Sequence, residues 1–449
     1  MKSASEIYYR QRKDLLHIFN QALSASHPYK LIYDKISIER DTITVDKVNY
    51  PMSDEQKVWV LGSGKASAQM ALAIEDRLGN QIYDGLVVCP GGSQTSTRHI
   101  RQMEASHPIP DELSVEAAGA MLAIIKKIKP DDIVFYLMSG GSSALLCNLP
   151  DQLSLNSIRE TNRSLLNSGA NISEMNTIRR HLSLIKGGRL ALMLKEANLI
   201  NLVISDVPGD RPEDIGSGLL APDPTTFFDA IQIVKKYDLQ TVLPREAVQY
   251  LHEGAEGKVP ETLKFKIEKH RYVLLSNARF IANLASSAAR EMGYTVHLAD
   301  EAYSEETGTI AKKMCSSAVS VYNRNIQNAN TAALIYFGES YVNVTGSGKG
   351  GRNQELALVA ALELQDYHCI SIISVGTDGK DGPTDAAGAI ATGNTFIQAK
   401  HAGLNPEAFL KSHDSYSFFE AVRGLVKTGD TGNNLMDLQI ILIERIGTI

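Results

Sequence analysis

Residues 58–67 read VWVLGSGKAS, a short apolar run that passes through glycines into a helical pattern ending near Leu78. An apolar run of this length is typical of a strand buried on both faces of a sheet. The same order of apolar run, small residues and helix recurs after residues 85–88, 133–138 and 202–204. Strands that alternate with helices in this way predict an α/β fold built on a parallel sheet.

The alternation continues in the second half of the chain. We expect strands at residues 272–275, 295–298, 332–337, 341–344, 369–375 and 438–443, and helices at 277–292, 305–322 and from 353. At 449 residues the chain exceeds one ordinary hydrophobic core, so two domains are expected. We place them at residues 1–240 and 271–449. Residues 241–270, which have weak periodicity, become a connecting segment. Before the first sheet, residues 5–25 predict a helix and residues 36–45 a hairpin.

Composition and charge exclude several classes of protein. The net charge is −6, from 45 basic and 51 acidic residues, so nucleic acid is not a favoured partner. The four cysteines are widely spaced without a C-x-x-C pair, which argues against a zinc site or a disulfide framework. Neither a signal peptide nor an apolar run of membrane-spanning length is visible. We therefore expect a cytoplasmic protein with no membrane partner.

The loop after the first strand of the sheet predicts a phosphate site. Gly62, Ser63 and Gly64 let the backbone approach an anion at a helix start, and Lys65 adds a full charge there. The loop is not a Walker A motif, and it is a poor dinucleotide fingerprint because no acid follows the next strand. A tight turn with a solvated lysine is the alternative.

A second glycine loop follows the strand at 133–138. Residues 139–144 read SGGSSA, which offers backbone donors and small hydroxyls for an anion; a plain tight turn is the alternative. The nucleophile elbow G-x-S-x-G is absent. Residues 176–189 then concentrate cationic groups, and in a helix Arg179, Ser183 and Lys186 would share one face. That face is either solvated or part of the same anion site.

Residues 205–212 read SDVPGDRP directly after the apolar run 199–204. Ligands of open α/β sheets bind at the carboxyl ends of the strands, so Asp206 is a candidate for the chemistry. The alternative is an ordinary turn in which Asp206 caps a following helix.

Two further loops carry polar residues in the second half. Residues 346–355 read GSGKGGRNQE, in which Arg352 is able to clamp a phosphate or carboxylate through two parallel hydrogen bonds. Residues 376–385 read GTDGKDGPTD, whose aspartates, Asp378 among them, suit a divalent cation. Consecutive turns explain the glycines of this second loop equally well.

Taken together, these segments resemble glycerate 2-kinases of the two-domain MOFRL type, also called class II glycerate kinases. The segments that carry the resemblance cover most of the chain in order: 62–66, 106–112, 139–146, 176–189, 205–211, 221–227, 350–355, 376–379 and 381–388. The resemblance implies two α/β/α sandwich domains, the N-terminal one Rossmann-like, with an inter-domain catalytic cleft. It also implies ATP- and Mg²⁺-dependent phosphorylation of D-glycerate at its 2-hydroxyl, which gives 2-phosphoglycerate and ADP.

The resemblance also implies roles for individual residues. Lys65 and Arg352 look like a catalytic cationic pair, and Asp206 like a base or a metal-linked acid, with Asp378 as a second metal candidate. The expected contacts of ATP phosphates are Gly62, Ser63, Gly64, Gly346, Gly348, Gly350, Gly351 and Asp378. Those of the substrate are Ser139, Gly140, Gly141, Ser142, Ser143 and Arg179. We expect small-molecule partners and leave a homodimer open.

Departures from the family pattern keep other functions open. Ser142 stands where a third glycine is usual, residues 90–93 read PGGS where Lys-Tyr-Gly-His is frequent, and Asp430 stands where proline is common. The alternatives are a hydroxypyruvate reductase, a kinase of another short sugar acid and a sugar-acid sensor without turnover.

Overall fold

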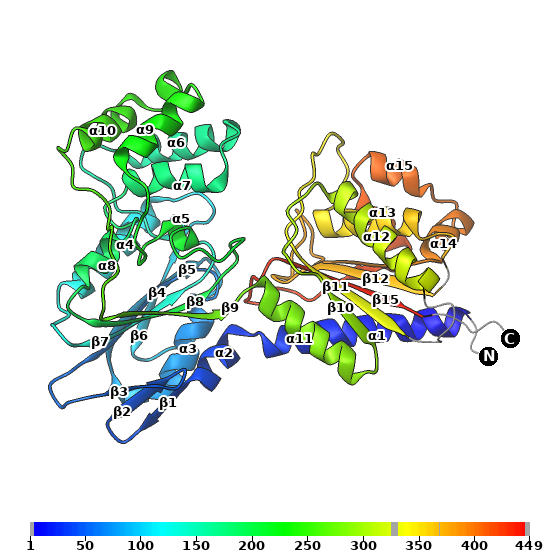
Figure 1. The fold of residues 1–449 in the computed structure, drawn as a ribbon, viewed down its shortest axis with the longest axis horizontal. Coiled ribbons are helices and arrows are strands. Elements are labelled where there is room, and N and C mark those ends of the chain that lie inside the picture. The colour runs from blue at the N-terminus through cyan, green and yellow to red at the C-terminus, as the bar shows by residue number, and fades with distance from the viewer. Residues whose placement is uncertain (1–3, 325–330, 368, 445–449) are drawn as a thin grey trace. The chain divides into compact units, whose positions relative to one another are not determined.

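The computed structural model describes residues 4–324, 331–367 and 369–444. The chain forms two compact units (Figure 1). The N-terminal unit is Pro28–Leu275, and the C-terminal unit is Met1–His27 together with Ser276–Ile449. The helix α1 (Ala4–Ala25) thus groups with the C-terminal half, and residues 241–270 fall inside the N-terminal unit. These divisions differ from the boundaries expected at 240 and 270.

A six-stranded sheet organises the N-terminal unit. Its order is β6-β5-β4-β7-β8-β9, and the first five strands run parallel. The strands are β4 (Val58–Ser63), β5 (Ile82–Pro90), β6 (Ile100–Ala105), β7 (Ile133–Met138), β8 (Asn198–Ile204) and β9 (His270–Ser276). The parallel sheet expected from the apolar runs is confirmed. Its carboxyl edge therefore gathers the loops that follow β4, β7 and β8.

Helices cover both faces of this sheet (Figure 1). On one face, α4 (Glu112–Ile125) shares a core with Trp59 and Leu61 of β4. The indole N–H of the buried Trp59 donates to the carboxylate of Asp132 at 2.8 Å, so its polar atom is satisfied. On the other face lies α3 (Ser67–Leu78), whose buried side chains include several alanines that permit close packing. The expected hairpin is also present, extended to a sheet of β1 (Ile36–Glu39), β2 (Thr42–Val45) and β3 (Val48–Pro51).

A group of helices with its own core completes the N-terminal unit. It comprises α6 (Leu155–Asn167), α7 (Ile172–His181), α9 (Phe227–Lys236) and α10 (Arg245–Ala255). Within the segment interpreted as connecting, α10 buries Tyr250 and Leu251. Gly254 is required there, because a Cβ at this position would lie 2.2 Å from the Phe227 ring. Because glycine is a poor helix former, Gly254 made the segment look non-helical in the sequence. In the structure the same glycine lets α10 pack closely against Phe227.

The C-terminal unit contains a six-stranded mixed sheet of order β10-β11-β15-β12-β13-β14. The last strand, β15, runs antiparallel to both of its neighbours, β11 and β12. The strands are β10 (Thr295–Leu298), β11 (Ala332–Gly338), β12 (Ile370–Gly376), β13 (Gly388–Thr392), β14 (Leu425–Val426) and β15 (Asp437–Ile443). The expected strand at 341–344 is wrong: Tyr341 makes only an isolated bridge to Glu306.

Helices pack on both faces of this second sheet as well. One face carries α1 and α11 (Ala278–Glu291), and the other carries α12 (Thr307–Arg324) and α13 (Arg352–Glu363). The remaining short helices, α14 (Thr395–His401), α15 (Pro406–Lys411) and α16 (Ser415–Ala421), follow β13. The expected two-domain α/β architecture is confirmed. Within the described ranges, no helix combines the length and apolar character of a membrane-spanning segment.

Candidate active site

The two glycine loops of the N-terminal unit are fastened to each other at the carboxyl edge of the sheet. The Lys65 N–H donates to the Gly140 carbonyl at 2.8 Å, and the Ala66 N–H donates to Ser139 Oγ at 3.0 Å. Gly64 has a φ of +132°, and a Cβ there would lie 2.1 Å from Ser139 Oγ. Glycine is therefore needed for the approach of one loop to the other rather than for the approach of a ligand.

Internal hydrogen bonds also occupy the first loop's backbone donors. Besides Lys65 and Ala66, the Gly64 N–H donates to the Val88 carbonyl at 3.0 Å and the Ser67 N–H to the Gly64 carbonyl at 3.2 Å. Gly62 and Ser63 belong to β4 and are buried. In this structure the expected phosphate cradle at 62–64 is closed, which leaves the Lys65 side chain as the loop's candidate anion contact.

Three of the four serines near the second loop are buried and hydrogen-bonded within the two loops and the sheet. Ser63 Oγ lies 2.9 Å from Tyr136 Oη. The Ser142 hydroxyl donates to the carbonyls of Ser63 and Ser139, both at 2.7 Å. Ser63, Ser139 and Ser142 are all buried, so their hydroxyls hold the two loops together. We narrow the expected serine contacts to Ser143, whose hydroxyl lies 2.9 Å from that of Ser217 at the edge of a cavity.

Asp206, just past the end of β8, lies against the second loop. A Cβ at Gly140 would stand 1.9 Å from Asp206 Oδ2, so only glycine leaves room for this carboxylate. On the other side, Gly141 has a φ of +91°, and a Cβ there would lie 2.9 Å from the His107 ring. Burial and, secondarily, the charge of Lys65 lower the pKa of His107 to about 4, so its imidazole is neutral near pH 7. The loop thus holds a carboxylate and a neutral imidazole on its two sides.

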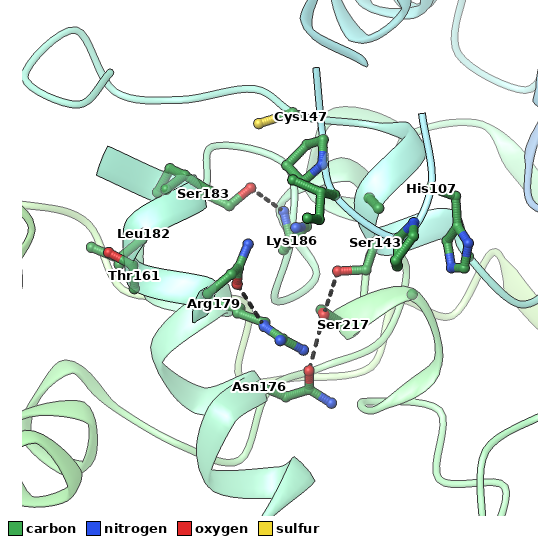
Figure 2. Close-up of a pocket in the computed structure, with 18 of the residues that line it drawn as sticks. His107, Ser143, Cys147, Thr161, Asn176, Arg179, Leu182, Ser183, Lys186 and Ser217 are labelled. Atoms are coloured by element: carbon green, nitrogen blue, oxygen red, sulfur yellow. Dashed lines mark hydrogen bonds between the residues drawn. The ribbon is translucent and has the colours of Figure 1, made fainter. Parts of the chain in front are cut away.

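These groups border a cavity of about 490 Å³ inside the N-terminal unit (Figure 2). Its polar lining includes Gly140, Gly141, Ser143, Asn176, Arg179, Lys186 and Asp206. Apolar side chains from the helical group, such as Ile158 and Leu182, form much of the remaining wall. Cavities of this size bind small molecules through a few convergent polar groups on an apolar wall.

Arg179 and Lys186 give the cavity a cationic side. Arg179 lies on α7, and its Nε donates to Asn162 Oδ1 at 2.9 Å (Figure 2). Burial lowers the pKa of Arg179, and it lowers that of Lys186 to about 8, where the neighbouring guanidinium acts in the same direction. Among the described residues, neither cation forms a salt bridge with a carboxylate. The sequence predicted that both residues share one helix face, but it did not single out Lys186 as a ligand contact.

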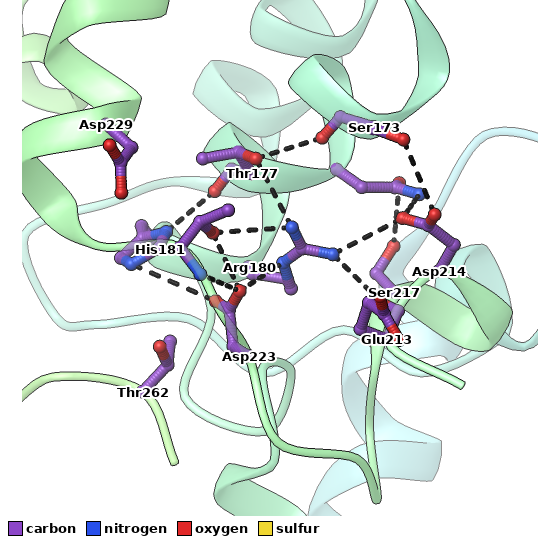
Figure 3. Close-up of polar contacts among 12 residues, drawn as sticks. Ser173, Thr177, Arg180, His181, Glu213, Asp214, Ser217, Asp223, Asp229 and Thr262 are labelled. Carbon is purple, nitrogen blue, oxygen red and sulfur yellow. Dashed lines mark hydrogen bonds and ion pairs between the residues drawn. The ribbon is translucent and has the colours of Figure 1, made fainter. Parts of the chain in front are cut away.

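The adjacent Arg180 is, by contrast, neutralised behind the cavity wall (Figure 3). This buried guanidinium lies 3.4 Å from Asp214 Oδ1 and 3.1 Å from Asp223 Oδ1. Asp214 accepts from the Asn176 amide at 3.2 Å, and Asn176 accepts in turn from Ser217 Oγ at 3.2 Å. This chain of contacts holds α7 against the loop that contains Ser217. The sequence offered little signal for it, because Asp214 and Asp223 are distant along the chain.

Arg352, in the C-terminal unit, is already held by two acids. Its Nε and Nη2 donate to the two carboxylate oxygens of the buried Asp437, at 2.7 and 2.9 Å, and Nη1 lies 2.6 Å from Glu339. Burial raises the pKa of Asp437 to about 6 despite the opposing effect of Arg352. The expected bidentate clamp on a ligand is, in this structure, a clamp on Asp437.

The glycine loop before Arg352 is packed against its own unit. A Cβ at Gly346 or Gly348 would meet the Ser412 carbonyl, one at Gly350 the Ser415 hydroxyl, and one at Gly351 the Asp381 carboxylate. Asp381 itself accepts from the backbone N–H groups of Asn353 at 3.0 Å and Gln354 at 2.8 Å. The N-terminus of α13 therefore binds an internal carboxylate where an ATP phosphate was expected.

The described residues give limited support to a preformed metal site. No group of three or more His, Cys, Asp or Glu able to hold a metal occurs among them. Asp206 borders the cavity of the N-terminal unit, whereas Asp378 lies in the C-terminal unit and accepts from the Lys380 N–H at 3.1 Å. The assignment of Mg²⁺ to these two residues stays a prediction.

Comparison with known proteins defines the class first. The family model described as a domain of unknown function, DUF4147, matches residues 14–252, and the MOFRL family model matches residues 332–437. The chain is therefore a protein of the two-domain class that joins a DUF4147 domain to a MOFRL domain.

Individual relatives specify the family. The chain is 37% identical over 431 residues to the glycerate 2-kinase of Pyrococcus horikoshii, covering 95% of this chain and 96% of the relative. It is 37% identical to the D-glycerate 2-kinase of Thermotoga maritima, covering 88% and 93% of the two chains. A crystal structure of glycerate kinase from T. maritima matches with a TM-score of 0.85 at 32% identity, covering 97% and 100%. The chain belongs to the glycerate 2-kinase family.

Two similar relatives, both from Agrobacterium vitis, are named putative hydroxypyruvate reductase. One of them is 37% identical over 423 residues, covering 94% of this chain and 95% of the relative. Glycerate kinases from zebrafish, cattle and human also match, at 28–29% identity over 95% of this chain. The names as a whole favour a kinase, and the family resemblance read from the sequence is confirmed.

Proposed function

We propose that the protein transfers the γ-phosphoryl group of ATP to the 2-hydroxyl of D-glycerate, giving 2-phosphoglycerate and ADP. The observation that carries this proposal is the placement of Asp206 against Gly140, at the edge of a cavity that Arg179 also lines. A carboxylate and a cation on one small cavity suit an acceptor that has both a hydroxyl to be activated and an acid group to be bound.

In the proposed reaction the acceptor's carboxylate binds at the cationic side and its 2-hydroxyl approaches Asp206. Asp206 takes the hydroxyl proton as the oxygen forms a bond to the γ-phosphorus, and the bond from that phosphorus to the β–γ bridging oxygen breaks. ADP leaves with those electrons. Such a transfer needs alignment and charge neutralisation more than covalent help, and we assign part of that neutralisation to Lys65.

Mg²⁺ would neutralise ATP phosphate oxygens. Of the two carboxylates that line the cavity, Asp214 is paired with arginines, so Asp206 is the one whose oxygens would fit this hard cation. Because a single protein carboxylate suffices when phosphates and water supply the other ligands, the residues present are compatible with a nucleotide-borne ion. Asp378 remains a candidate ligand in the C-terminal unit. We further propose small-molecule substrates as the partners and the cytoplasm as the site of action, with a homodimer left open.

Arg352 keeps its proposed catalytic role in a modified form. About a third of its side chain, 34%, stays exposed while Asp437 and Glu339 hold the guanidinium. The two acids would fix its orientation, and the exposed part would contact a phosphate of ATP. This single contact from a fixed guanidinium replaces the bidentate clamp on the ligand that the sequence predicted.

The test is an ATP-consumption assay with D-glycerate, L-glycerate and D-erythronate, with NADH oxidation by hydroxypyruvate measured in parallel. We expect ATP consumption with D-glycerate and little NADH oxidation, because β5 ends at Cys89 and Pro90 without an acid to bind a ribose. Preference for erythronate would redirect the substrate. NADH oxidation without ATP consumption would favour the reductase, and inactivity in every arm would favour a sensor. Lys65→Ala should lower kcat while the fold remains intact.

A further inference from the structure

The cavity of the N-terminal unit contains two cations that no acid balances. Lys186 is only 9% exposed, and Arg179 lies next to it on the same side of the cavity (Figure 2). Within the described ranges, neither cation forms a salt bridge, and the two carboxylates that line the cavity are Asp206 and Asp214. Burying charges without partners is costly, so such a pair is expected only where an anion binds.

A second carboxylate at the cavity is not available to these cations. Asp214 also lines the cavity, but it pairs with Arg180 and with Arg211. Cys147, which faces Lys186, has a pKa raised by burial, so its thiol is neutral near pH 7. Lys186 and Arg179 therefore keep their positive charge for a ligand.

The backbone that carries Lys186 is fixed from both sides. The N–H groups of Ile185 and Lys186 both donate to Ser183 Oγ at 3.3 Å. Behind it, Gly187 and Gly188 have φ values of +60° and +75°, and a Cβ at either would lie 2.6 Å from Thr262 or Leu263. Because these contacts require glycine, the segment has little freedom to carry the ammonium out toward water. The position of the charge is set before a ligand arrives.

The same cavity is also lined by a buried hydroxyl group, that of Thr161. Thr161 is 2% exposed and lines the cavity, and its Oγ1 has no hydrogen-bond partner among the residues that the structure describes. A buried hydroxyl without a partner is uncommon and costs free energy in the empty site. It is an observation independent of the two cations, and it points to the same conclusion: the cavity is organised around a ligand.

We propose that Lys186 and Arg179 together bind the carboxylate of the acceptor, and that Lys186 makes the enzyme select a hydroxy acid over a neutral polyol. The proposal rests on the proposed function and deepens it by naming a specificity-determining residue. A guanidinium binds one or both carboxylate oxygens with fixed geometry, and an ammonium adds a compact charge from a second direction. A neutral analogue would leave the charges of the buried Lys186 and the half-buried Arg179 unbalanced, which is how a polar site rejects a ligand that lacks the matching group.

The experiment compares wild-type protein with Lys186→Met, and with Lys195→Met as the matched control on an exposed lysine of the same unit. Calorimetry without ATP measures binding of D-glycerate and of glyceramide, its neutral amide. We expect Lys186→Met to weaken glycerate binding about tenfold or more and to abolish most of the preference over glyceramide. Lys195→Met should change neither. Lys186→Arg should recover part of the binding.

Kinetics adds a readout that a purely structural lysine would not move. In wild-type protein kcat/KM for D-glycerate should fall as the pH rises above about 8, the pKa that burial gives Lys186, and this fall should be absent in Lys186→Met. The substitution should act mainly on KM.

Unchanged glycerate binding in Lys186→Met would overturn the inference, and so would weakened ATP binding with glycerate binding intact, which would assign the cations to nucleotide phosphates. If wild-type protein binds glycerate through Lys186 but consumes no ATP, the proposed kinase activity fails and the carboxylate site stands. If the wild-type protein and Lys186→Met phosphorylate glycerate equally well, the proposed kinase activity is supported and the proposed carboxylate site is refuted.

Discussion

The sequence predicts an anion-binding role for both Arg179 and Arg352, but the structure gives the two arginines opposite surroundings. Arg179 lies beside Lys186 in a cavity, and neither has an acidic partner among the described residues. Arg352 is held by Asp437 and Glu339, next to a helix N-terminus that Asp381 already occupies. A cation near a glycine loop is therefore free to balance the charge of a ligand only where the fold brings no acid to it, whereas an acid-held arginine such as Arg352 has its charge already balanced and its orientation fixed.

The two arginines also predict different consequences of substitution in the two units, one on activity and the other on stability. In the N-terminal unit, substitutions near the cavity should alter binding and turnover while stability changes little or improves. In the C-terminal unit, removing Arg352 should cost stability because it leaves a buried acid without its partner. Substitutions in both units, each with a control variant in the same unit, test whether the effects on activity and on stability separate in this way.

The largest effect is expected for Asp206→Asn. An amide keeps the shape of the side chain but cannot accept the acceptor's proton, so kcat should fall by about 10²–10⁴-fold with KM little changed. Steady-state kinetics measures this. Asp210→Asn in the same loop is the control, since its φ of +51° suits asparagine, and it should keep near-normal turnover. Equal losses in both variants would remove Asp206 from the chemistry.

Arg352→Met should produce the largest loss of stability. Asp437 is fully buried and would lose both hydrogen bonds, which for a broken buried ion pair costs about 3–5 kcal/mol, less the relief that its protonation gives. Denaturant unfolding followed by probes in each unit measures this. Lys349→Met, an exposed cation of the same loop, should change stability by less than about 1 kcal/mol. An unaltered unfolding midpoint for Arg352→Met would contradict the structural role.

Gly140→Ala should lower turnover without a comparable loss of stability. The added methyl group would overlap the Asp206 carboxylate and push it from its position, so we expect kcat to fall about tenfold to a hundredfold. Gly119→Ala is the control, because nothing lies within 4 Å of a Cβ there and alanine suits its helix, α4. Normal kinetics for Gly140→Ala would show that the position of Asp206 is unimportant.

The smallest effect is a gain: Lys186→Met should stabilise the ligand-free protein by about 1–3 kcal/mol at pH 7. The folded-state pKa of Lys186 is about 8, below the usual value for lysine, so the unfolded chain binds more protons between those two pH values. Wild-type stability therefore rises with pH across that window, and the advantage of the variant should shrink toward zero near pH 10. Thermal unfolding over a pH series measures both. A destabilised variant would instead indicate a structural lysine.

The sequence predicted well those features that depend on local pattern. The apolar runs of β4, β5, β7 and β8 and the start of α13 were placed within a few residues, because each has its own periodicity and loop. The position of β15 between β11 and β12 was beyond its reach. Pairing of strands more than 60 residues apart depends on the packing of the whole unit rather than on local pattern.

The candidate site was predicted in part for the same reason. The sequence singled out Asp206 and Arg179, which now border one cavity. It did not anticipate that Asp437 and Asp381 would occupy Arg352 and the N-terminus of α13, since those partners come from distant segments. Nor did it separate Lys186 from its charged neighbours, because only burial without a partner distinguishes it.

The identity of the product formed from ATP and D-glycerate tests the proposed reaction most directly. Phosphorus and carbon NMR of the reaction mixture distinguishes 2-phosphoglycerate from 3-phosphoglycerate and detects ADP. We expect equal amounts of 2-phosphoglycerate and ADP, with formation slowed at least a hundredfold by Asp206→Asn. No phosphorylated acid, or a product phosphorylated at the 3-hydroxyl, would contradict it.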